Sequence, residues 1–202
     1  MVPKSRNTCL HPWLHSVTGC GQTMMASSPQ GPVLYPSQKS SDAKKEFQSF
    51  PRTYRVHDSQ QMVWVLTGNS LIAVPASNNV KPVVLSVMTC RDTEFQDTEK
   101  GNLVFLGIKN KKLCLFCMEI DSKPTLQLKD VDITEVYNES KAQKAFLFYH
   151  GTEGSTSVFQ SVSYPGWFIA TSSTARQTVT LTQQRGESNN TNFYLEPEDL
   201  LV

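Results

Sequence analysis

Twelve short β-prone runs, spread almost evenly over residues 53–202, are the feature that most limits what this chain can fold into. Each run is rich in β-branched or aromatic residues, and turn-forming Gly and Asn mark many of the breaks between them. The pattern predicts an all-β barrel or sandwich in one domain, and periodicity alone does not choose between the two. The predicted strands are Thr53–Asp58, Met62–Leu66, Leu71–Pro75, Pro82–Thr89, Leu103–Ile108, Leu113–Met118, Thr125–Lys129, Ala145–His150, Ser157–Ser161, Trp167–Thr171, Thr178–Thr182 and Asn192–Leu195.

The twelve strands fall into three groups of four, over 53–91, 102–150 and 156–196. Three units of similar length suit a threefold β-trefoil, although residue identity between the groups is too low to demonstrate a repeat. The only helical pattern follows the seventh strand, with Asp130 as the predicted N-cap. Its apolar side is formed by Ile133, Val136 and Tyr137.

Residues 1–52 have a different composition, with eight Ser, six Pro and three Gly against eight Leu, Val or Phe. Such a segment buries too little apolar surface to offset the entropy of ordering, so we expect a disordered leader, either a plain tail or a processed pro-segment. The leader carries six Lys or Arg and two Asp or Glu (+4), whereas 53–202 carries thirteen and sixteen (−3). A domain of negative net charge disfavours nucleic-acid binding.

The chain shows no signal for export or membrane insertion. It has no apolar run of the roughly 18 residues that a membrane span needs. Its N-terminus also lacks the continuous apolar stretch of a secretory signal peptide. Taken alone, these features predict a cytoplasmic protein, and the five cysteines, an odd number without regular spacing, are expected to be reduced.

Residues suited to catalysis or metal binding do not converge in the sequence. Cys114 and Cys117 have C-x-x-C spacing, but three steps along a strand direct the two sulfurs to opposite faces. His57 and Asp58 alternate across a strand, so they do not form a base and its orienting acid, and His150 stands alone before a glycine. No nucleophile elbow, zinc-helix or phosphate-loop motif is present. We therefore expect no enzymatic activity, no metal and no cofactor.

The stretch 159–179 is the most specific in the chain. Two β-prone runs flank the corner Tyr164-Pro165-Gly166, where Pro fixes φ and Gly accepts a positive φ. The order of residues around this corner resembles the signature segment of the interleukin-1 family of cytokines. The residues that match are Phe159, Ser161, Val162, Pro165, Phe168, Ile169, Ala170, Thr171 and Val179.

The resemblance covers essentially all of 53–196 and is strongest to the interleukin-36 branch of the family. It implies a β-trefoil over 47–202, preceded by a leader or pro-segment over 1–46. The segments that carry it are VHDSQQMVWVL (56–66), CRDTEFQD (90–97), EKGNLVFLGIK (99–109), KPTLQLK (123–129), AFLFY (145–149), GSTSVFQSVSYPGWFIATSS (154–173) and NFY (192–194).

The family's function, as the resemblance implies it, is receptor assembly without catalysis. The domain would bind the interleukin-36 receptor as a monomer, recruit the interleukin-1 receptor accessory protein and so activate inflammatory signalling. Export would follow a route independent of a signal peptide. The resemblance also places receptor contacts on the trimmed N-terminus and on the loops 91–101 and 183–190. The loop residues expected to contribute are Arg91, Asp92, Glu94, Asp97, Arg185 and Glu187.

Activation by an endoprotease is a further expectation from the family pattern. Trimming would leave about nine residues before the aliphatic-x-Asp motif Val56-His57-Asp58, which places the cut between Glu46 and Phe47. Two alternatives stay open. One is an antagonist of the same family, and the other is a heparin-binding, growth-factor-like trefoil that would use the basic turn formed by Lys109, Lys111 and Lys112.

Overall fold

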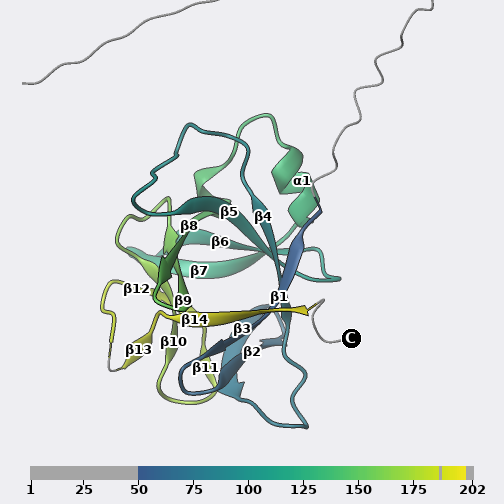
Figure 1. The fold of residues 1–202 in the computed structure, drawn as a ribbon, viewed down its shortest axis with the longest axis vertical. Coiled ribbons are helices and arrows are strands. Elements are labelled where there is room, and N and C mark those ends of the chain that lie inside the picture. Colours follow the sequence, from purple (N-terminus) through teal and green to yellow (C-terminus); the bar gives the residue numbers. More distant parts are fainter. Residues whose placement is uncertain (1–49, 187, 199–202) are drawn as a thin grey trace, which may run out of the picture. The chain divides into compact units, whose positions relative to one another are not determined.

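The computed structural model describes residues 50–186 and 188–198, and nearly every regular element in this range is a β-strand. The strands are β1 (Arg52–Asp58), β2 (Met62–Thr67), β3 (Ser70–Pro75), β4 (Val84–Thr89), β5 (Asn102–Ile108), β6 (Leu113–Ile120), β7 (Lys123–Asp130), β8 (Leu147–Glu153), β9 (Thr156–Ser161), β10 (Phe168–Ser172), β11 (Gln177–Thr178), β12 (Thr180–Thr182), β13 (Asn189–Asn190) and β14 (Phe193–Pro197). Figure 1 shows β1 and β14 side by side across the domain.

Six strands form a closed antiparallel ring. β1 pairs with β4, β4 with β5, β5 with β8, β8 with β9, β9 with β14, and β14 returns to β1. Closure leaves these strands without a free edge, which distinguishes a barrel from a sandwich. The all-β prediction is confirmed, and the open choice is resolved in favour of the barrel.

Three hairpins complete the fold: β2–β3, β6–β7 and the pair β10–β12. Each hairpin lies in sequence between two barrel strands, so the chain repeats the pattern of strand, hairpin, strand three times. This is the β-trefoil that the three groups of four strands suit and that the family resemblance implies. The last predicted hairpin strand, Thr178–Thr182, divides into β11, which pairs with β3, and β12, which pairs with β10. The short strand β13 was not predicted.

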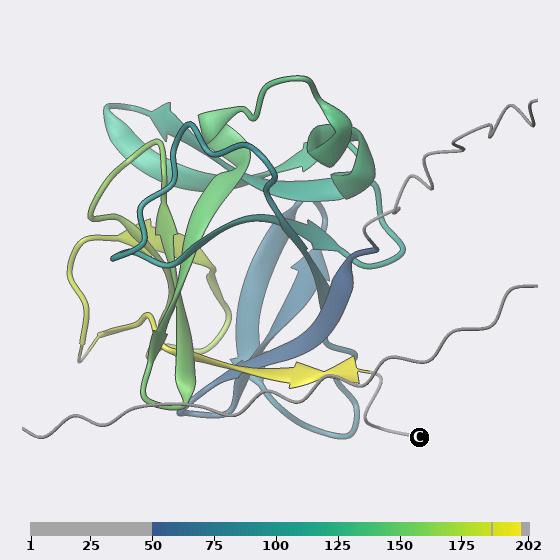
Figure 2. The same ribbon diagram turned by 45° about the horizontal axis from the view of Figure 1, so that its top comes forward.

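Apolar side chains fill the barrel interior, and six of them, one on each barrel strand, lie at its centre. All six are at most 2% exposed, so they form a close-packed centre. They are Val56, Leu85, Leu106, Phe148, Phe159 and Phe193. A second cluster lies outside the ring, beside the hairpin β6–β7 and the helix α1 (Ile133–Asn138), which Figure 2 shows on one side of the domain.

The helix begins later than predicted. Its N-cap is Asp132, whose carboxylate accepts a hydrogen bond from the backbone N–H of Thr134 at 2.8 Å. Asp130 does not cap it, because β7 continues through Asp130 in register with Leu113. Ile133 and Val136 are buried, as the apolar pattern predicted. The predicted strand start at Ala145 is also wrong, since Lys144–Phe146 forms a turn of 3-10 helix before β8.

Candidate functional site

The early loop, residues 91–101 between β4 and β5, is tied to the domain through its backbone. The hydroxyl of Tyr149, on β8, donates to the carbonyl oxygen of Phe95 at 2.7 Å. The Asp92 carboxylate accepts from the backbone N–H of Glu94 at 3.0 Å and from that of Ala142 at 3.2 Å. These N–H donors hold the pKa of Asp92 below its usual value. Asp92 therefore links the loop to the segment that follows α1.

Arg91 and Asp97 fix the two ends of the early loop. The Arg91 guanidinium lies 4.3 Å from the centroid of the Tyr137 ring and donates to Asn138 Oδ1 at 3.4 Å. Asp97 forms a salt bridge with Lys100 at 2.9 Å, and this bond lowers the pKa of Asp97. Gly101 closes the loop with a φ of +109°. Glu94 is exposed.

The late loop, residues 183–190, is held at Arg185 by a two-pronged salt bridge to Glu153 at the end of β8. The guanidinium donates to the two carboxylate oxygens at 2.8 and 2.7 Å. Its Nε donates to the hydroxyl of Thr191 at 2.8 Å, and its plane covers the ring of Phe168 at 4.6 Å. The pKa of Glu153 is lowered mainly by the bond from Arg185. Most of the donor capacity of this guanidinium is thus satisfied within the domain.

Two open grooves border these loops. The first, of about 520 Å³, is lined by Arg91, Asp92 and Glu94 together with the end of α1. The second, of about 490 Å³, lies between the two loops and is lined by Lys100 and Arg185. The structure thus brings part of the early loop and part of the late loop to one groove, although 83 or more residues separate them in the sequence.

The predicted contact residues are therefore divided between the grooves. Arg91, Asp92 and Glu94 share the first, Arg185 lines the second, and Asp97 reaches the second only through its partner Lys100. Glu187 lies outside the described residues. Sequence reasoning did not single out Glu153 or Tyr149, because their partners are distant in the chain, and it missed Lys100 although its partner Asp97 is only three residues away.

The signature residues form part of the scaffold. Most of them are buried: Phe159, Ser161, Val162, Ile169, Ala170, Thr171 and Val179. Phe168 lies under the Arg185 guanidinium, and Pro165 is exposed at the corner between β9 and β10. The segment therefore identifies the fold through packing, while the predicted contacts lie elsewhere.

The aliphatic-x-Asp motif ends β1, and its acidic residue is structural. Asp58 is 1% exposed and accepts three hydrogen bonds, from the N–H groups of Gln60 and Met62 and from the hydroxyl of Thr171. The predicted processing residues Glu46 and Phe47 precede the described part of the chain.

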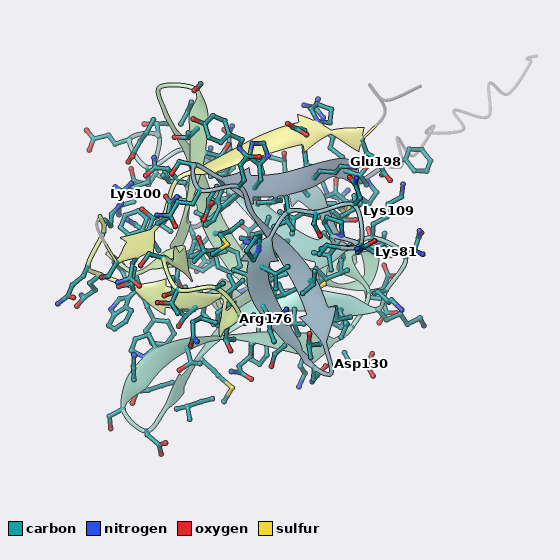
Figure 3. The ribbon with its side chains drawn as sticks, turned by 90° about the horizontal axis from the view of Figure 1, so that it is seen from below. Lys81, Lys100, Lys109, Asp130, Arg176 and Glu198 are labelled. Atoms are coloured by element: carbon teal, nitrogen blue, oxygen red, sulfur yellow. The ribbon has the colours of Figure 1, made fainter. Side chains whose placement is uncertain are left out.

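The structure also bears on the remaining sequence motifs. Cys117, on β6, packs against the central core and Cys114 in the outer cluster, so the two thiols face apart as predicted. Within the described residues no group of three or more His, Cys, Asp or Glu is arranged to hold a metal ion. No helix in this part of the chain is long and apolar enough to cross a membrane. Lys109, in the basic turn, is paired with Glu198, as Figure 3 shows.

Comparison with known proteins identifies the family. The model of the family "Interleukin-1 / 18" matches residues 75–195. The chain belongs to the interleukin-1 family. It is 76% identical to interleukin-36 beta of Mus musculus over 148 residues, which cover 73% of this chain and 81% of that protein. Members of this family are signalling proteins that act outside the cell and catalyse no reaction.

Two further relatives, an antagonist and a pro-inflammatory cytokine, are similar to this chain. The human interleukin-36 receptor antagonist protein is 36% identical over 152 residues, which cover 72% of this chain and 95% of that protein. The NMR structure of the pro-inflammatory cytokine interleukin-36alpha matches with a TM-score of 0.64 and 41% identity, covering 74% of this chain and 94% of that one. This chain is thus an interleukin-36 beta-like member of the interleukin-1 family with a β-trefoil fold.

Proposed function

We propose that this cytokine is an agonist that binds the interleukin-36 receptor and then recruits the interleukin-1 receptor accessory protein. The observation that carries the proposal is its 76% identity to an interleukin-36 beta, against 36% to the receptor antagonist protein. A further relative of the same branch, interleukin-36alpha, is described as pro-inflammatory. Joining the two receptor chains would bring their intracellular domains together and start inflammatory NF-kappa-B and MAP kinase signalling.

The arrangement of the two loops supports a ligand with two contact faces. A monomer that bridges two receptor chains needs two separate surfaces, each with its own polar pattern. The groove beside Arg91, Asp92 and Glu94 carries both signs of charge next to α1, and the groove between the loops offers Lys100 and Arg185. Both loops are anchored to the barrel, so each face is largely formed before binding, which reduces the entropy lost on association.

Alanine substitutions test these faces. Replacing Arg91 and Glu94 together, and separately Gln183 and Gln184, removes exposed side chains without touching the core. We expect each pair to lower receptor affinity or the recruitment of the accessory protein, measured with purified receptor ectodomains. Unchanged affinity and unchanged recruitment in both variants would refute receptor contact at the first groove and at the exposed start of the late loop. The basic turn serves as a control, because Lys111→Ala should leave both measurements as they are.

Activation by removal of the leader is part of the proposal. The precursor would be made in the cytoplasm, exported independently of a signal peptide and cut by an endoprotease between Glu46 and Phe47. We expect a chain starting at Phe47 to activate receptor-bearing reporter cells at far lower concentration than the full chain. Chains starting at Glu46 and at Gln48 are matched controls, since each differs by one residue. Equal potency of all four proteins would exclude activation at this site.

The antagonist alternative makes the opposite prediction in the same cells. An antagonist would occupy the receptor, give no reporter signal at any concentration and block a known agonist. The 36% identity to the antagonist protein is the observation that favours this alternative. A reporter signal from the Phe47 form that requires both receptor chains would exclude it.

A further inference from the structure

We infer that Asp58, together with Thr171, is a positioning residue that fixes the late loop for receptor contact. The receptor part of this inference rests on the proposed function above. The observation behind it is a buried hydrogen bond between residues 113 positions apart, from the hydroxyl of Thr171 to Asp58 Oδ2 at 2.6 Å. Both residues are at most 1% exposed.

Asp58 is bound from two sides. Its Oδ1 accepts the backbone N–H groups of Gln60 at 2.8 Å and Met62 at 2.9 Å, which shapes the turn between β1 and β2. Its Oδ2 takes the Thr171 hydroxyl from β10. Within the described residues the carboxylate forms no salt bridge. A buried carboxylate of this kind depends on its hydrogen bonds, so losing one donor leaves an acceptor without a partner.

The Thr171 end of this bond belongs to β10, which pairs with the end of the late loop. Thr171 is in register with Asn190, and Ser172 with Asn189, where β13 pairs with β10. The turn after Asp58 reaches the same place, because Asn190 Nδ2 donates to Ser59 Oγ at 3.0 Å. The β1–β2 turn therefore touches the late loop directly and also through β10.

A second anchor holds the opposite end of the loop. Arg185 is bound to Glu153 and to the buried hydroxyl of Thr191, while Asn192 donates to Glu153 at 2.9 Å. Between the anchors, Gly186 and Asn189 exchange two backbone hydrogen bonds at 3.0 Å. The Asp58 anchor lies in the protein interior, so it affects a receptor only through the position of the loop.

The test uses Thr171→Val, which keeps the side-chain shape and removes the hydroxyl. Four amides report the state of the late loop: those of Ser173, Gly186, Asn189 and Asn192, each of which donates within this region. We expect Thr171→Val to speed their hydrogen exchange about tenfold to a hundredfold, as fits a buried acceptor left without its hydrogen-bond donor. Receptor affinity and reporter potency of the Phe47 form should fall by about tenfold.

Two variants separate positioning from general loss of stability. Asp58→Asn keeps an oxygen for the two backbone N–H groups and offers an N–H to the Thr171 hydroxyl oxygen, so exchange and potency should stay near wild type. Tyr149→Phe removes a comparable hydrogen bond at the early loop. It should speed exchange at Gln96 and Lys100, whose amides bond within that loop, and leave the four late-loop amides unchanged.

The inference is overturned if Thr171→Val leaves the four amides unchanged, or if it loosens them without lowering receptor affinity. Exchange that rises equally throughout the domain also overturns it. The paired alanine variant at Gln183 and Gln184 distinguishes a failure of the proposed receptor face from a failure of the positioning role. If that variant keeps full potency, the proposed receptor face has failed. If it loses potency while Thr171→Val does not, the face stands and the positioning role alone is wrong.

Discussion

Replacing Gly101 with Ala should damage this domain far more than the same change at another glycine with positive φ. Gly101 ends the early loop at a φ of +109° and leads directly into β5. A Cβ at this position would lie 2.2 Å from the carbonyl oxygen of His150 and 2.7 Å from its carbonyl carbon. These are backbone atoms of β8, which pairs with β5 at Asn102, so no side-chain rotation relieves the contact.

The cost follows from two separate effects. A non-glycine residue held in a sparsely populated backbone region costs about 1–3 kcal/mol. Forcing an atom into a packed site costs about 1–3 kcal/mol more, since neighbouring backbone must move. Together they predict a loss of about 4 kcal/mol, a large share of the roughly 5–15 kcal/mol that stabilises a typical domain. Gly154 is the matched control, with a φ of +60° and nothing within 4 Å of the added Cβ, so Gly154→Ala should cost only about 1–2 kcal/mol.

Urea unfolding followed by the fluorescence of buried Trp64 measures both changes. With a slope of about 2 kcal/mol per molar urea, Gly101→Ala should lower the midpoint by roughly 2 M and Gly154→Ala by about 0.5–1 M. Equal midpoint shifts for the two variants would refute the argument, because the backbone contact with His150 would then carry no cost.

Two further predictions concern buried titratable groups. Burial raises the pKa of Cys114 and of Cys117 to about 12, so at pH 8 both thiols should be alkylated only after unfolding. Half-buried Cys90 should instead react in the native protein. Mass spectrometry of the modified peptides measures both outcomes. Burial lowers the pKa of His150 below 6.5, so the folded state favours the neutral imidazole. The stability that this preference contributes to the folded state is fully present above pH 6.5 and is lost as the pH falls below 6.5. Urea midpoints of wild type and His150→Gln should therefore converge between pH 7 and pH 5, and a constant difference would contradict this.

The strands could be predicted from the sequence because burial leaves a local record there, whereas the choice of a trefoil barrel came from the family resemblance. Each barrel strand places at least one apolar side chain in the core, and alternation around residues such as Val56 or Phe159 is visible in a short window. The errors occur where pairing with a residue distant in the sequence overrode a local sequence pattern. Asp130 satisfies the pattern of an N-cap, yet pairing with Leu113 keeps it in β7 and leaves the cap to Asp132.

The loop residues were harder to interpret for the same physical reason. Arg185 is charged and lies in a polar loop, and such a residue is commonly expected to face a partner. In the structure it binds Glu153, 32 positions away, and covers Phe168. Asp92 likewise holds the amide of Ala142, 50 positions away. Neither pairing has a period or motif that a single sequence displays, so the contacts that these charged side chains make within the domain were not predicted.

These internal pairings change where differences between agonist and antagonist should be sought. If charged loop residues are largely bound within the domain, loop shape is set by groups that lie outside the loops themselves. For the early loop these groups are Tyr149 and Ala142, and for the late loop they are Glu153, Asp58 and Thr171. A substitution at any of them would move exposed atoms while leaving the loop sequence unchanged. Relatives with nearly identical loops could therefore recruit the accessory protein to different extents, and a comparison confined to exposed residues would miss the cause.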